Sequence, residues 1–208
     1  MPTLKTTTSD YELRYHTAQR IELRESDDGP PKLIGYAAVF DSWSENLGWF
    51  REIIRPGAFK DSLARGDDVR ALIDHTPSKI IGRRSAKTLD VREDDHGLHV
   101  EVALPDTAAA RDIIESIKRR DVDGMSFQFI TVSDRWGMED GEEIRELLKV
   151  DLIDVSVVTF PAYPTTDVAL RTEVAKRSQE NYMRTHKPTP YALMRRRLAL
   201  AELDMDSE

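Results

Sequence analysis

The sequence predicts a soluble α+β domain that is mainly β, an antiparallel barrel of about seven strands with two or three helices packed outside. Short β-prone runs recur along the chain between turn signals rich in Gly, Pro and Asp. Residues 106–120 have the spacing of apolar side chains that an amphipathic helix requires. Closely spaced strands with few helices favour an antiparallel sheet or barrel over alternating βαβ units.

The expected strands are short runs of β-branched and aromatic residues that end at turn residues. In chain order they cover residues 21–23, 33–40, 69–74, 88–93, 98–104, 124–132 and 144–159. The two runs on either side of Asp94–Gly97 form the clearest hairpin, because alternate residues of the second run are apolar. Gly35 indicates a close backbone approach or a bend within its strand. Residues 134–143 are expected to form a charged turn.

The helices are expected where turn residues and caps enclose an apolar stripe. A brief helix begins at Pro56 and closes at Gly66, and Asp106 or Thr107 caps a longer one. A third, short amphipathic helix covers residues 191–205.

The chain is expected to consist of one domain with two extensions. Residues 1–20 form an N-terminal arm, in which residues 11–15 alternate as in a short strand. Residues 21–171 form the domain, and residues 172–208 form a polar linker followed by the C-terminal helix.

The composition excludes several classes of protein. Among the 208 residues, 30 basic and 38 acidic side chains give a net charge of −8, which argues against a general phosphate-backbone binder. There is no cysteine, so disulfides, thiolate nucleophiles and cysteine-based zinc sites are excluded. No apolar run approaches the roughly 18 residues of a membrane-spanning helix, and the N-terminus lacks an apolar signal core. We therefore expect a cytoplasmic protein with no membrane partner and no specific nucleic-acid partner.

Three polar residues occur where packing alone would not require them. His75 follows a β-prone run and precedes Pro77, which places it at a strand end or in the loop beyond. Ser126 lies inside an expected strand, and Asp154 lies inside an apolar one, where an unpaired carboxylate is costly. A serine nucleophile needs a neutral imidazole to remove its proton, and the imidazole needs a carboxylate to fix its tautomer. The three residues are therefore a candidate catalytic set.

Each of these residues also has a structural interpretation. A lone histidine at a strand end commonly makes local hydrogen bonds, and Asp154 is alternatively a barrel-rim carboxylate or the partner of an arginine. Asp151 has the same side chain on the opposite face of the strand, so only one of the two faces a given site. His96 and His99 lie on the two sides of a hairpin turn with no third ligand, so we expect no metal and no cofactor.

Five separate motifs occur in one order along the chain. They are Gly-Tyr-Ala-Ala-Val-Phe (35–40), Glu-Ile-Ile-Arg-Pro-Gly-Ala-Phe (52–59), His75 followed by Ile-Gly-Arg (81–83), Gly-Met-Ser-Phe-Gln-Phe (124–129) and Leu-Ile-Asp-Val-Ser-Val-Val-Thr-Phe-Pro-Ala-Tyr-Pro (152–164). Together they closely resemble the prohead maturation protease family of tailed bacteriophages, which is related in fold to the herpesvirus assembly proteases. The resemblance covers residues 21–171.

The resemblance implies a serine endopeptidase of herpesvirus-protease-like fold, enclosed in the immature capsid (the prohead) in the host cytoplasm. Such an enzyme cuts scaffold protein, or the scaffold-like N-terminal part of the major capsid protein, and often its own chain. The family's histidine corresponds to His75, its nucleophile to Ser126 and its third residue, usually a glutamate, to Asp154. Aspartate is one methylene shorter than glutamate, so its carboxylate reaches less far. Asp151 therefore stays a reserve candidate for this third position. Gln128 is a second departure, since the family more often has a small residue there.

Two other classes of function stay open. One is a scaffold or assembly factor of the same fold that has lost catalysis and acts by binding capsid proteins. The other is a metal-dependent hydrolase. The oligomeric state also stays open, with a homodimer among the alternatives.

Overall fold

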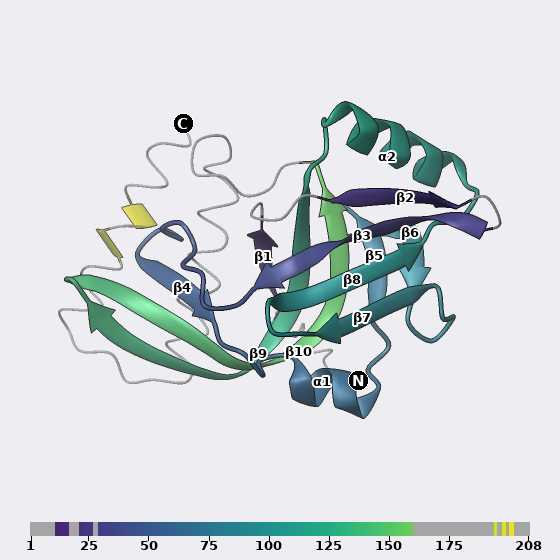
Figure 1. Ribbon diagram of the computed structural model, residues 1–208. Helices are drawn as coiled ribbons and strands as arrows, with labels where there is room; N and C mark the ends of the chain where they lie inside the picture. The colour runs from purple at the N-terminus through teal and green to yellow at the C-terminus, as the bar shows by residue number, and fades with distance from the viewer. Residues whose placement is uncertain are drawn as a thin grey trace, which may run out of the picture.

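The computed structural model describes residues 11–16, 21–26 and 29–159 and the single positions 194, 197, 198, 200 and 201. Within these segments the chain forms ten strands and two helices, and the strands make two sheets (Figure 1). The first sheet has the order β1-β9-β10-β5-β6, and β4 also pairs with β10. Its strands are β1 (Tyr11–His16), β4 (Phe50–Ile54), β5 (Arg70–Ile73), β6 (Thr76–Arg83), β9 (Gly124–Glu139) and β10 (Glu142–Val158).

The second sheet is antiparallel throughout, in the order β2-β3-β8-β7. Its strands are β2 (Glu22–Ser26), β3 (Gly29–Val39), β7 (Leu89–Glu93) and β8 (Gly97–Ala103). The helix α2 (Ala108–Arg119) lies beside this sheet and buries Ile113 and Ile117 in the common core (Figure 1). The Thr107 hydroxyl accepts a hydrogen bond from the Ala110 N–H at 3.2 Å, so the expected cap is confirmed.

Gly35 lies where the two sheets approach each other. A Cβ at this position would lie 2.9 Å from the Sδ atom of Met125 on β9, closer than real side chains pack. The absence of a side chain therefore allows β3 to approach β9, and the close approach expected at this glycine is confirmed.

The fold is mainly β, as the sequence predicts, but a closed barrel of about seven strands is not confirmed. The described strands form two separate hydrogen-bonded sheets, and β10 runs parallel to both β4 and β5. The short helix α1 (Lys60–Arg65) ends at Gly66, whose φ of 81° is the left-handed conformation that favours glycine. In the described part of the chain, no helix is long and apolar enough to cross a membrane.

The prediction of a charged turn over residues 134–143 is wrong. Strands β9 and β10 continue through this segment as one long hairpin, and only Asp140 and Gly141, both with positive φ, separate them (Figure 1). Apolar contacts at the far end favour the strands, because the Trp136 ring stacks on Trp49 with centroids 5.0 Å apart. Charged residues around Trp136 hid this pattern in the sequence.

The two expected extensions lie largely outside the described residues. The alternation expected for residues 11–15 corresponds to β1, so that short strand is confirmed. The described positions between 194 and 201 are helical. The boundaries expected after residues 20 and 171, and the linker, lie outside the described part.

Four buried charges join β1 to the rest of the first sheet, and we call them the ion cluster: Glu12, Arg14, Glu52 and Arg145. Arg145 is fully buried and binds Glu12 through Nη1 at 2.7 Å and Glu52 at 3.2 Å. Arg14 binds Glu52 through Nε at 2.5 Å and Glu12 through Nη2 at 2.8 Å. Burial raises the pKa of Glu12, but the charges of Arg145 and Arg14 outweigh it and hold that pKa well below its usual range.

We expect Arg145→Met to lower the free energy of unfolding by about 3–5 kcal/mol, because it leaves Glu12 and Glu52 with one guanidinium and removes the ion pair with the largely buried Asp134. Urea unfolding at neutral pH measures the change. Arg111→Met removes an arginine whose ion pair with Asp106 is exposed, and it should cost less than about 1 kcal/mol. Equal losses in the two variants would contradict a stabilising role for the cluster.

The depressed pKa of Glu12 also predicts an acid dependence of stability. The unfolded chain takes up a proton near the usual value of 4.5, whereas the folded chain does so only at lower pH. The stabilisation is therefore complete above that value and is lost as the pH falls below it. Between about pH 6 and about pH 3, Glu12→Gln should lose less unfolding free energy than the original chain. The same loss in both chains would show that Glu12 does not carry the effect.

Candidate active site

His75 lies on the two-residue turn that joins β5 to β6. Asp74 and His75 both have left-handed backbones, with φ of 48° and 49°, as turns that match the twist of a hairpin require. The end of β10 fixes this turn, because the Asp74 N–H donates to the Val157 carbonyl at 2.9 Å. The Asp74 carboxylate also accepts the N–H of Thr159 at 2.8 Å. These bonds compensate for the cost of a non-glycine residue with positive φ.

The imidazole of His75 lies between Ser126 and Asp154. Its Nε2 atom is 2.5 Å from Ser126 Oγ, and its Nδ1 atom is 2.6 Å from Asp154 Oδ1. Ser126 comes from β9 and Asp154 from β10, so three distant segments form one hydrogen-bonded row. An ionised Asp154 accepts the Nδ1 proton, which leaves Nε2 as the acceptor for the serine hydroxyl. This is the arrangement in which an imidazole removes a proton from a serine.

Asp151, the reserve candidate, lies away from this row. Its Oδ1 atom binds Arg65 Nη2 of α1 at 2.5 Å. The expectation that it lies on the opposite face from Asp154 is wrong, because a register shift between Leu152 and Asp154 interrupts the alternation. Asp151 is opposite Ile130 and Asp154 is opposite Gln128, two positions that share one face of β9.

Ser156 is a residue of the site that the sequence reasoning missed. It is 1% exposed and directly opposite Ser126 in the pairing of β10 with β9. Its Oγ atom accepts the His75 N–H at 3.2 Å and lies 3.2 Å from Asp154 Oδ1 and 3.3 Å from His75 Nδ1. Alternation along the strand would have found it, since it lies two residues beyond Asp154.

The hydroxyl of Ser126 is covered. The residue is 0% exposed, and its Oγ atom lies 2.9 Å from the carbonyl oxygen of Arg14 on β1. His75 and Asp154 are also largely enclosed, with side chains 11% and 6% exposed. In this state the row is formed, but solvent does not reach the hydroxyl of Ser126.

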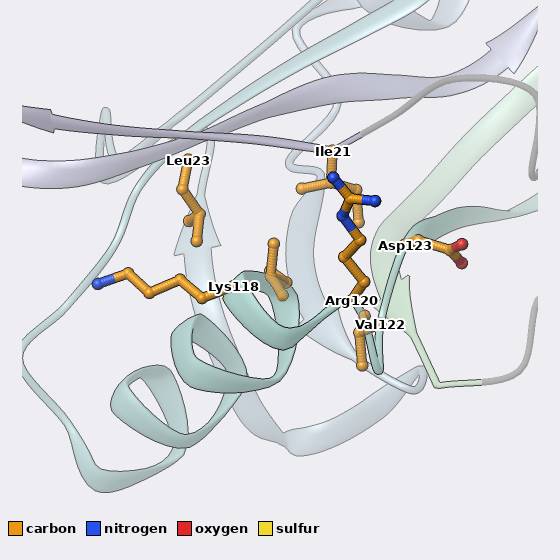
Figure 2. A pocket seen from close by; sticks show the side chains of 7 residues that line it. Ile21, Leu23, Lys118, Arg120, Val122 and Asp123 are labelled. Atoms are coloured by element: carbon orange, nitrogen blue, oxygen red, sulfur yellow. The ribbon is translucent and has the colours of Figure 1, made fainter.

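Two other features lie apart from this row, a pocket and the histidine pair noted in the sequence. A pocket beside α2 is lined by apolar side chains with charged ones around them (Figure 2). Its lining residues are Ile21, Leu23, Ile117, Lys118, Arg120, Val122 and Asp123.

His96 and His99 contact the Tyr36 ring edge to face, with centroids 4.6 Å and 5.2 Å away. None of these residues belongs to the serine–histidine–aspartate row.

Comparison with known proteins agrees with the resemblance found in the motifs. The family model described as caudovirus prohead serine protease matches residues 19–184. No curated protein matches the chain. Among solved structures, the capsid assembly protease gp21 of bacteriophage T4 is similar over 74% of this chain and 100% of that one, with 9% identity and a TM-score of 0.51, which shows the fold alone. Because the family model matches most of its length, the chain belongs to the caudovirus prohead serine protease family.

Proposed function

We propose that this protein is a serine endopeptidase of phage capsid maturation, with Ser126 as nucleophile, His75 as general base and acid, and Asp154 as the group that orients His75. The observation that supports this most strongly is the continuous row from Asp154 through His75 to Ser126, with both distances at 2.6 Å or below. Membership of a serine protease family supplies the reaction class.

The geometry suits acyl transfer in two steps. As Ser126 Oγ attacks the carbonyl carbon of a peptide, its proton passes to Nε2 of His75. Asp154 stabilises the imidazolium that forms, and its burial strengthens this interaction. The imidazolium then gives the proton to the leaving amine as the C–N bond breaks. A water molecule, deprotonated by the same imidazole, releases the acyl group and restores the serine.

The proposed substrates are scaffold protein, the scaffold-like segment of the major capsid protein, and the tails of the enzyme itself, residues 1–20 and 172–208. The place of action is the immature capsid in the host cytoplasm. In this proposal the domain of residues 21–171 has the barrel arrangement of the herpesvirus assembly proteases. The T4 protein of similar fold is described as a capsid assembly protease, which supports this assignment.

One observation favours a second candidate, a capsid scaffold or assembly factor without catalysis. Ser126 is 0% exposed, and a nucleophile that stayed covered would never meet a substrate. Intact mass measurement of the purified chain over time distinguishes the two. Trimming within the tails supports the enzyme, whereas an unchanged chain that binds capsid protein supports the scaffold.

Removing the nucleophile should abolish cleavage. We expect Ser126→Ala to lower turnover of a capsid or scaffold substrate by about six orders of magnitude, and Asp154→Asn to lower it by about 10⁴, because the imidazole loses its orienting acceptor. Rates of product formation measure both. Ser116→Ala is the matched control, since the half-buried Ser116 lies on α2, apart from the row, and its hydroxyl donates to the Asp112 carbonyl at 3.0 Å. Cleavage that survives Ser126→Ala would overturn the proposal.

Ser156 is expected to position His75 rather than react. Ser156→Ala removes an acceptor from the His75 N–H and a hydroxyl beside the Asp154 carboxylate. We expect kcat to fall about 10- to 100-fold, as for the loss of a hydrogen bond to a charged group. KM should stay unchanged because the Ser156 hydroxyl contacts His75 and Asp154, and in this proposal it does not contact the substrate. A change in KM alone would contradict this role.

A further inference from the structure

A pocket lies between the C-terminal end of α2 and the start of β2, apart from the serine–histidine–aspartate row (Figure 2). Its volume is about 420 Å³, within the range of pockets that hold a ligand. Its apolar lining comes from Ile21, Leu23, Ile117 and Val122. Because these side chains offer no hydrogen bond, the charged residues around them decide which ligands the pocket accepts.

Arg120 places a guanidinium at this pocket (Figure 2). It follows the last residue of α2 with a φ of 67°, the left-handed conformation that glycine most often supplies at the end of a helix. This ending is fixed, because the Arg120 N–H donates to the Ile117 carbonyl at 3.0 Å. The next N–H, that of Asp121, donates to the Ser116 carbonyl at 2.9 Å. The backbone that carries the guanidinium is therefore held in one conformation.

The left-handed conformation costs free energy at an arginine. A residue with a Cβ is strained there, whereas glycine is not. Residues held in strained conformations occur at functional sites more often than elsewhere, and His75 is held in the same conformation. An arginine at a position that favours glycine therefore indicates a role for its side chain other than stability.

Arg120 also differs from its basic neighbours in having no acidic partner. Lys118 binds Glu25 at 2.8 Å, and Arg119 binds Asp121 at 3.0 Å. Within the described part of the chain Arg120 makes no ion pair, and it is exposed. An unpaired guanidinium beside an apolar pocket suits a ligand that joins a carboxylate to a large apolar group.

Asp123 restricts the ligand further. It is exposed and lines the same pocket, and in Figure 2 Arg120 lies between Leu23 and Asp123. Its carboxylate can accept a main-chain N–H, but it repels a ligand with concentrated negative charge, such as phosphate. Because Lys118, Arg120 and Asp123 are all exposed, a bound ligand stays partly in solvent, whereas small-molecule sites bury about 70–90% of their ligands. These features fit a peptide segment better than a small molecule.

We infer that this pocket is a docking site for a partner protein, through a peptide segment in which a carboxylate neighbours a large apolar side chain. Arg120 binds the carboxylate, and the apolar side chain fills the space between α2 and β2. Docking does not require catalysis by Ser126, so the inference goes beyond the proposed function. Since Asp123 directly precedes β9, which carries Ser126, a protein docked here is held near the row at an effective concentration of about millimolar.

The first test measures binding by NMR on the isotope-labelled full chain carrying Ser126→Ala, which prevents cleavage of the probe. The probes are acetyl-Glu-Phe-amide and acetyl-Phe-Glu-amide, which present the two orders of the side chains. We expect at least one of them to shift the amide signals of Ile117 and Val122, with half-saturation at about millimolar concentration. Probes with glutamine in place of glutamate, or alanine in place of phenylalanine, should bind at least about tenfold more weakly.

The second test separates binding from stability with Arg120→Gly. Glycine adopts a φ of 67° without strain, so the midpoint of thermal unfolding should be at or above that of the original chain. The variant should bind the glutamate probe at least about tenfold more weakly and should no longer distinguish it from the glutamine probe. Arg119→Ala is the matched control, because Arg119 is exposed, binds Asp121 and does not line the pocket. Its probe binding should equal that of the original chain.

Several results would overturn the inference. They are equal binding of the glutamate and glutamine probes by the original chain, unchanged binding in Arg120→Gly, or no shift of the pocket signals up to about 10 mM probe. A lower thermal midpoint of Arg120→Gly would show that the arginine serves the helix end, which also contradicts the inference. Failure of the proposed function is seen separately, since a chain that binds the probes but never cleaves a substrate keeps the docking site and loses the protease.

Discussion

The candidate site depends on the position of β10 between two partners. Along one edge, β9 places Ser126 opposite Ser156. Along the other edge, β5 runs parallel and ends with Ile73 opposite Val157, so the turn that follows brings His75 back over β10. The Asp154 side chain then meets an imidazole from one neighbour and, through it, a hydroxyl from the other. Because all three groups are held by strands or a bonded turn, their spacing is set by the sheet.

The parts of this arrangement that depend on neighbouring residues could be predicted from the sequence. The cap at Thr107, the loop position of His75 and the strands around Ser126 and Asp154 follow from local spacing and turn chemistry. The parallel pairing of β10 could not be predicted, because parallel strands are joined by long connections without a local signature. The register shift beside Asp154 was hidden for a similar reason, since one extra residue in a strand leaves its apolar pattern nearly unchanged.

The ion cluster was also beyond local reasoning, yet it determines how β1 is held. Glu12 and Arg145 are 133 residues apart, and Glu52 and Arg145 are 93 apart, so no spacing pattern relates them. A strand held by buried apolar side chains loses all of the free energy of that burial when it separates from the sheet. Charges, in contrast, regain hydration, and the desolvation penalty of an ion pair offsets much of its Coulomb attraction. A strand fixed by ions is therefore well positioned, although its ion pairs contribute less to stability than their number suggests.

The row of Asp154, His75 and Ser126 is already formed beneath β1, so for the proposed protease the limit lies in access to Ser126 rather than in the arrangement of the three groups. Asp154, His75 and Ser126 are already within 2.6 Å of their partners, so opening needs no rearrangement among them. The observed cleavage rate is then the cleavage rate of the form in which Ser126 is exposed, multiplied by the fraction of molecules in that form. Each 1.4 kcal/mol of free energy needed to expose Ser126 lowers that fraction about tenfold. For the proposed protease, a small population with Ser126 exposed would mean slow cleavage in free solution.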